Sequence, residues 1–220
     1  MISPFARGPT MSMTVHDVSS TAAGSITSSL FTPKTLHDRL ERMAFPGVDE
    51  LTRMIEPIAA AYGMDVEKVR TVAAGKKSQV VIALDSDAHP TLDELEVVSN
   101  ELSELFDARE NAGEINFGAG YTLEVTTPGV DLPLTEPRHW RRNRGRLVAV
   151  GEEKFRIGAL DAAEENVVLI PTAQKQPRPE VRPVSGLAPA VVEIEFNTPP
   201  AAQNELAELS FDQAAERAAN

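Results

Sequence analysis

Tyr121 to Arg146 reads YTLEVTTPGVDLPLTEPRHWRRNRGR, and this stretch decides how the chain is organised. Its first residues alternate between apolar and polar side chains, which is typical of a strand. Pro128 and Gly129 then predict a tight turn that ends the strand. A connector with two further prolines follows, and the last ten residues carry five arginines. The stretch therefore predicts the end of one domain, a linker, and the start of another.

The arginine-rich end of this stretch is the candidate binding site. The whole chain carries a net charge of −12, so five neighbouring arginines form a local positive surface. Guanidinium groups bind phosphate as charged forks, and an aromatic ring can stack on a base. We therefore expect nucleic acid or a ribonucleoprotein to bind here. The candidate residues are Arg138, His139, Trp140, Arg141, Arg142, Arg144 and Arg146.

Two structural interpretations compete with this one. Trp140 is the only tryptophan and stands at a domain junction, which favours docking of the linker into the following domain. The arginines could also pair with the acidic face of a helix predicted around residues 93–104. The turn before them is interpreted as architecture, because hydroxyl groups satisfy the backbone that a Pro-Gly turn frees. The residues assigned to this linker and turn are Thr126, Thr127, Pro128, Gly129, Asp131, Pro133 and Leu134.

The composition narrows the class of protein. The chain has 220 residues, is 42% hydrophobic and contains no cysteine, which excludes disulfides and thiolate metal sites. It has no run of about 18 apolar residues, so we expect no membrane span. It also lacks a His-Glu-x-x-His pattern, a phosphate loop and a dinucleotide-binding glycine pattern. We therefore expect no catalysis, no cofactor and no metal.

The first part of the chain predicts a two-layer domain. Residues 1–46 are interpreted as a disordered tail, because residues 19–32 are mostly small and polar. Residues 47–132 are predicted to form an α/β domain with the order helix, strand, strand, helix, strand. The first helix ends at Gly63, and a capping box of Thr91 and Glu94 opens the second. This order predicts two helices on one face of a three-stranded sheet.

The second part of the chain has a different sequence pattern, with short β-prone runs in place of long helices. Residues 133–145 are assigned to the linker. Short β-prone runs separated by polar turns then predict a small barrel over residues 146–197. Residues 198–220 are rich in Pro, Ala, Glu and Gln, and are expected to be a flexible tail because isolated short helices are marginal. The fold class is therefore α+β, an α/β domain followed by a small β-barrel.

Three segments resemble the bacterial ribosome maturation factor RimP family. LEVTTPGVDLPLTEPRHWRRNRGRLV, at residues 123–148, resembles the family signature. VVIALDSDAHPTLDELEVVSNELSELFD, at residues 80–107, resembles its second strand and helix, and VVEIEF, at residues 191–196, its last barrel strand. The resemblance covers about residues 47–196, and the extended termini suggest an actinobacterial version. Leu132 departs from the family, which commonly has a basic residue there, so we expect no RNA contact at that position.

The resemblance implies an SH3-like or Sm-like barrel as the second domain. It also implies a cytoplasmic factor without catalysis that binds the free 30S small ribosomal subunit during assembly. The implied contacts are 16S rRNA and a basic ribosomal protein near the decoding centre, and we expect a monomer.

Two alternatives to this function remain. A standalone RNA-binding regulator would need stacking aromatics, but Phe155 and Phe196 are the only phenylalanines of the barrel and neither clearly faces outward. A small enzyme would need titratable groups that converge on one site, which the sequence does not show.

Overall fold

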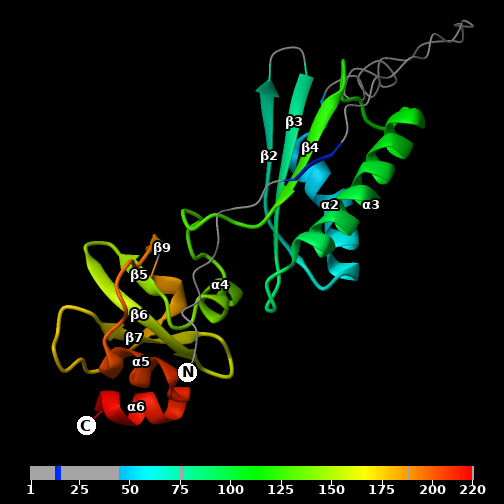
Figure 1. Cartoon of the computed structure of the whole chain (residues 1–220). Coiled ribbons are helices and arrows are strands. Elements are labelled where there is room, and N and C mark those ends of the chain that lie inside the picture. Colours follow the sequence, from blue (N-terminus) through cyan, green and yellow to red (C-terminus); the bar gives the residue numbers. More distant parts are fainter. Residues whose placement is uncertain (1–12, 16–44, 75–76, 188, 220) are drawn as a thin grey trace, which may run out of the picture. The chain divides into compact units, whose positions relative to one another are not determined.

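The computed structural model describes residues 13–15, 45–74, 77–187 and 189–219. The chain divides into two compact units between Pro128 and Gly129 (Figure 1). Most of the predicted N-terminal tail lies outside the described residues. Within the described residues, no helix is both long and apolar enough to span a membrane.

The first unit has two layers, with both helices on one face of a sheet (Figure 1). The sheet has the strand order β1-β4-β3-β2. β2 and β3 form an antiparallel hairpin, whereas β3 and β4 are parallel and are joined through α3. The elements in chain order are β1 (Met13–Val15), α2 (Val48–Ala61), β2 (Asp65–Ala74), β3 (Lys77–Asp85), α3 (Leu92–Asn111) and β4 (Tyr121–Thr126).

Local sequence explains where these helices begin and end. Thr91 Oγ1 accepts from the Glu94 backbone N–H at 3.3 Å, and the Glu94 carboxylate accepts from the Thr91 N–H at 2.7 Å. This confirms the predicted capping box at the start of α3. Gly63, at φ +66°, follows the end of α2, as predicted. Pro57 lies inside α2, which continues to Ala61.

The core of the first unit lies between the sheet and its two helices. Aliphatic side chains fill most of it, and an aromatic group closes one part. Phe117 and Tyr121 stack with ring centroids 4.1 Å apart, while Phe45 meets Phe117 edge-on at 5.4 Å. Burial raises the pKa of Tyr121 above its usual range. Phe45, two residues before the predicted start of the domain at Gly47, packs against this core.

The sequence predicts a three-stranded sheet, but the sheet of the first unit has a fourth strand, β1. β1 lies within the predicted tail and pairs antiparallel with β4, with Met13 opposite Val125 and Val15 opposite Leu123. The pairing satisfies part of an edge that β4 would otherwise leave open. A three-residue strand is too short to show a period in the sequence, which explains why it was missed.

The second unit is built on an antiparallel sheet with the order β8-β7-β6-β5-β9. Its strands β5, β6 and β7 lie within residues 146–197, where the sequence predicts short strands. Among the described residues β8 and β9 do not pair, so the sheet is not a closed barrel. The elements are α4 (Pro137–Arg142), β5 (Leu147–Val150), β6 (Glu153–Leu160), β7 (Asn166–Pro171), β8 (Glu180–Pro183), the 3₁₀ helix η1 (Val184–Gly186), β9 (Ala190–Val192), α5 (Ala201–Glu208) and α6 (Phe211–Ala219).

Both faces of this sheet are covered. One face packs in a cluster that contains Trp140 of α4 together with Val148 and Val192. The opposite face packs Val168 and Ile170 against α5 and α6. The expectation of a flexible tail at residues 198–220 is therefore wrong for residues 201–219, because these short amphipathic helices gain a hydrophobic surface to cover. Within the sheet, β6 passes very close to β7 at Gly158. A Cβ atom added to Gly158 would lie 2.9 Å from Val168 Cβ.

Candidate functional site

The arginine-rich stretch forms the short helix α4 rather than an open linker. Pro137 is at the first helical position, where its missing N–H costs nothing. His139 Nδ1 accepts the backbone N–H groups of Thr135 at 3.0 Å and Glu136 at 3.2 Å. The side chain of His139 thus fixes the entry into the helix.

Two of the predicted contact residues are buried in the unit's own structure. Trp140 is 0% exposed and belongs to the core on one face of the sheet, and His139 is 8% exposed. Neither ring is available to stack on a base, so the functional interpretation of these two residues is wrong. The alternative interpretation, in which Trp140 docks the connector into the second domain, describes its position. Its indole N–H has no hydrogen-bond partner within the described part of the chain.

The arginines differ in what they contact. Arg144 donates from Nε to the Ala207 carbonyl at 2.9 Å and from Nη2 to the Leu209 carbonyl at 2.8 Å. It therefore caps the C-terminal end of α5, where a positive charge is favourable. Arg141 is exposed and pairs with Glu164 of the same unit.

The remaining arginines lie on the same short segment. Arg138 approaches Glu136 at 3.9 Å, and Arg146 donates to Asn143 Oδ1 at 3.0 Å. Arg138, Arg142 and Arg146 are all half-buried. The segment thus keeps a group of guanidinium side chains at the surface of the second unit, while Arg144 serves the fold.

Three of the residues assigned to the turn and linker take part in the packing or backbone hydrogen bonds of the junction. Thr126 is buried at the end of β4, and the Leu132 N–H donates to the Gly129 carbonyl in a turn. Leu134 is buried, and its N–H donates to the Ala190 carbonyl at 2.8 Å. The predicted linker at residues 133–145 is consequently folded into the second unit, since both Leu134 and Trp140 belong to its core.

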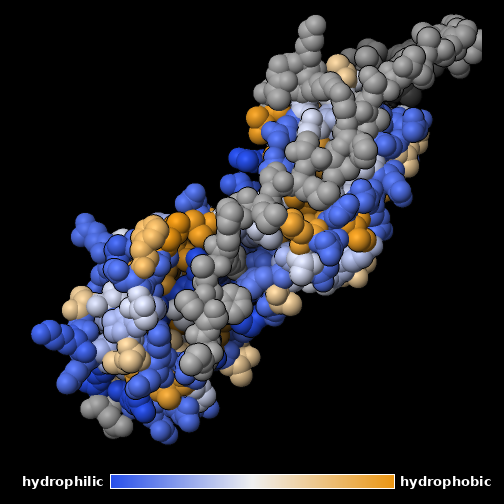
Figure 2. Space-filling model, in the orientation of Figure 1, coloured by the Kyte–Doolittle hydropathy of each residue, from blue (hydrophilic) through white to orange (hydrophobic). Residues whose placement is uncertain are grey.

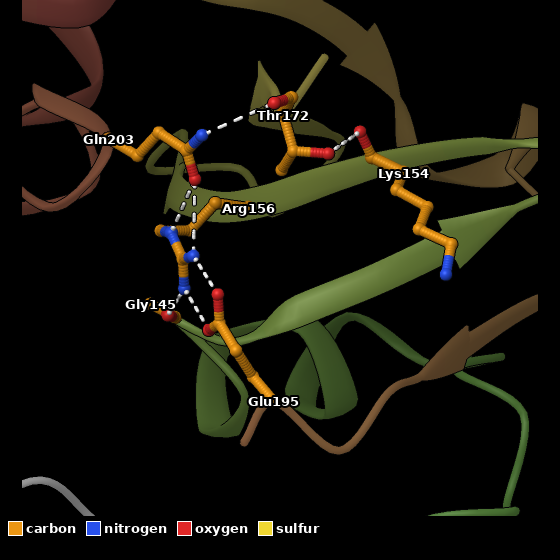
Figure 3. Close-up of polar contacts among 6 residues, drawn as sticks. All are labelled: Gly145, Lys154, Arg156, Thr172, Glu195 and Gln203. Atoms are coloured by element: carbon orange, nitrogen blue, oxygen red, sulfur yellow. Dashed lines mark hydrogen bonds and ion pairs between the residues drawn. The ribbon is translucent and has the colours of Figure 1, made fainter. Parts of the chain in front are cut away.

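A buried arginine that the sequence analysis did not single out bonds to the C-terminal end of the arginine-rich segment (Figure 3). Arg156, on β6, has a side chain only 1% exposed. Its guanidinium donates to both carboxylate oxygens of Glu195 at 3.0 and 2.8 Å, to Gln203 Oε1 at 3.1 Å, and to the Gly145 carbonyl at 2.9 Å. These bonds join the segment after β9, the start of α5 and the end of the arginine-rich segment.

The segment held by Arg156 exposes two large apolar side chains. Ile194 is 59% exposed and Phe196 is 91% exposed. Phe155 is buried as expected, but for Phe196 the sequence-based interpretation is wrong, because its side chain faces solvent. Figure 2 shows that the surface is otherwise largely hydrophilic on the side in view, with hydrophobic side chains in small groups. The alternation in VVEIEF gives no signal for this, since it places residue 196 on the same face as the buried Val192.

Among the residues that the structure describes, no three His, Asp or Glu side chains are grouped so that they could hold a metal ion. The second unit carries the arginines of residues 138–146 and, on the segment after β9, the exposed Ile194 and Phe196.

Comparison with known proteins gives a consistent result. The RimP N-terminal domain family matches residues 54–131. A ribosome maturation factor RimP from Corynebacterium aurimucosum is 52% identical over 184 residues, covering 80% of this chain and 98% of that protein. Those of Corynebacterium diphtheriae and Corynebacterium kroppenstedtii are 49% and 41% identical, with 97% and 99% of their lengths covered.

Proposed function

Because the chain belongs to the ribosome maturation factor RimP family, we propose that it acts in ribosome maturation by binding the free 30S small subunit, without catalysis. It works in the cytoplasm as a monomer and contacts 16S rRNA and a basic ribosomal protein near the decoding centre. Such a factor assists assembly by binding one local conformation better than its alternatives.

One observation carries this proposal. A chain with a net charge of −12 concentrates guanidinium groups on α4, and Trp140 anchors that helix in the core of the second unit. A positive surface on a fixed support attracts phosphate and positions it at the same time. The overall acidity of the chain opposes indiscriminate binding to RNA, which suits a factor that must select one subunit.

Co-sedimentation tests the proposal. The full chain is mixed with purified small subunits, large subunits and assembled ribosomes, and each mixture is centrifuged. We expect the protein to travel with free small subunits only. Equal association with both subunits, or with neither, would contradict it.

Charge substitution then tests the arginines. Replacing Arg138, Arg141 and Arg142 with Gln should weaken small-subunit binding. It should also flatten the salt dependence by about 2 in slope if three single-strand phosphates are lost, at about 0.7 each. Arg144 is left intact because it caps α5. A matched control replaces the exposed cations Lys175, Arg178 and Arg217, which carry the same total charge away from α4. Equal losses in both variants would indicate a general charge effect and not a site.

The two units are proposed to be separate domains that bind together. Segments covering residues 1–128 and 129–220 should each fold alone. Each should bind the small subunit much more weakly than the whole chain, because linkage raises the effective concentration of the second contact. One segment binding as tightly as the whole would remove this part of the proposal.

The second candidate function is a standalone RNA-binding regulator, which the exposed ring of Phe196 favours. It predicts binding to free RNA that is as tight as binding to the small subunit.

A further inference from the structure

The segment after β9 carries the most exposed large apolar side chain among the described residues. Val192, Ile194 and Phe196 alternate along it, and their exposed fractions rise from 5% to 59% to 91%. Alternate residues of an extended segment share one face. The strand thus begins in the core and ends by presenting an isoleucine and a phenyl ring to solvent.

Two sets of contacts hold the backbone of this segment in place. The Glu193 N–H donates to the Leu147 carbonyl at 2.9 Å, which continues the pairing of β9 with β5. Two residues further on, Glu195 is gripped by the buried Arg156, which also donates to the Gly145 carbonyl (Figure 3). The backbone on both sides of Ile194 is therefore fixed beside residues 145–147. Phe196 directly follows the second anchor, so local rearrangement does not bring its ring into the core.

The register places this apolar pair beside the arginine-rich segment. Val148 pairs with Val192, and both lie in the core on the same face of the sheet. Beyond this pair, the Arg156 guanidinium bonds both the Gly145 carbonyl and Glu195, and Arg146 and Phe196 directly follow these two residues. The two acidic residues of the segment point to the other face, where Glu193 pairs with Lys154 and Glu195 with Arg156. The exposed ring therefore directly follows the residue that ties its segment to the end of the arginine-rich stretch.

From this juxtaposition we propose that Phe196 is a stacking platform for an unpaired base of RNA. Ile194 forms the adjoining apolar wall, and Arg146 attracts the phosphate beside that base. An exposed aromatic ring next to arginine is the combination by which proteins hold single-stranded nucleic acid. The inference rests on the proposed function, to which it adds a defined contact with RNA in an unpaired region.

Anisotropy of a fluorescein-labelled single-stranded oligoadenylate, titrated with the full chain, tests the platform. Phe196→Leu keeps apolar bulk but removes the π face. It should weaken binding about 5- to 150-fold, the equivalent of about 1–3 kcal/mol per stacked base. Phe196→Trp should retain the affinity, and its new indole emission should be quenched by the RNA, against the constant background of the buried Trp140.

Tyr62→Leu is the matched control, because Tyr62 is an aromatic side chain 42% exposed in the first unit. Its affinity for the oligonucleotide should not change. Thermal melting of the Phe196 variants should match that of the wild type, because the ring is almost fully exposed. Wild-type affinity in Phe196→Leu, or no binding of oligoadenylate by the wild type, would overturn the inference.

Co-sedimentation separates this inference from the proposed function. If the wild type travels with small subunits while Phe196→Leu binds oligoadenylate normally, the stacking platform fails and the proposed function stands. If the wild type does not travel with small subunits, the proposed function itself fails. A Phe196→Leu variant that loses affinity for an isolated ribosomal protein but not for oligoadenylate would reassign the surface to protein docking and overturn the RNA platform.

Discussion

Replacing Arg156 with Met should destabilise the second unit by about 3 kcal/mol. Breaking a buried ion pair by removing one partner costs about 3–5 kcal/mol, because the other charge is left without compensation. Here Glu195 is 25% exposed and can regain some water, which places the expected cost at the lower end of that range. The Oε1 atom of Gln203, a residue only 4% exposed, also loses the guanidinium as its donor.

Urea unfolding followed by tryptophan fluorescence measures this cost. Trp140 is the chain's only tryptophan and is fully buried in the second unit, so its emission reports that unit alone. The midpoint should fall while the slope with denaturant stays constant, which signals a change in stability and not in the surface exposed. A domain with a stability of about 5–15 kcal/mol remains folded in the absence of urea after such a loss.

Two further variants make the reasoning refutable. Lys154→Met removes a cation from the same strand, β6, whose partner Glu193 lies on the same extended segment as Glu195. Lys154 is 53% exposed, so this ion pair should be worth less than about 1 kcal/mol. Arg156→Met combined with Glu195→Met removes both charges and should recover at least half of the loss. If Arg156→Met costs no more than Lys154→Met, the buried guanidinium does not hold the unit together.

Three other predictions follow from local geometry. Gly158→Ala should cost about 1–3 kcal/mol in the same fluorescence assay, because the new methyl group would collide with Val168 and cores tolerate overpacking poorly. Hydrogen bonds from the backbone and side chain of Thr91 lower the pKa of Glu94, so its contribution to stability is present at neutral pH and is lost as the pH falls below about 4.3. The stability difference between the wild type and Glu94→Ala, followed by circular dichroism, should therefore vanish at low pH. Removing residues 1–20 should accelerate amide hydrogen exchange along the outer edge of β4, since β1 pairs with that edge; unchanged exchange would contradict the pairing.

The elements of the first unit could be predicted because their signals are local. The capping box of α3, the glycine after α2 and the alternation in β4 all act over a few neighbouring residues. The helices α5 and α6 could not be predicted in the same way. Their few apolar residues stabilise a helix only when the face of β7 lies beneath them, which is a contact distant in sequence.

In the candidate site too, the features with a local sequence signal could be predicted, and those set by distant contacts could not. The arginines and the architectural turn are visible as composition, but composition does not show that Arg144 would cap α5 or that Trp140 would fill the core. Arg156 lies between the core residues Phe155 and Ile157 on β6, so its side chain is on the opposite face of the sheet. From the sequence alone, that face would be expected to be in contact with solvent. Arg156 is buried because the helices α5 and α6 cover that face. These are the helices that the sequence did not predict.

The parallel pairing of β3 with β4 has a consequence for how the first unit folds. β2 and β3 are neighbours in sequence and can zip together from their turn, as hairpins do within about 1–10 μs. β4 has no such local partner, because Ser78 pairs with Tyr121 across the whole of α3, and Met13 reaches Val125 from still further away. Loop-closure entropy opposes both contacts until α3 docks. β4 is thus expected to join the hairpin late, with β1 following it, and slow refolding phases should be sensitive to substitutions in the buried face of α3.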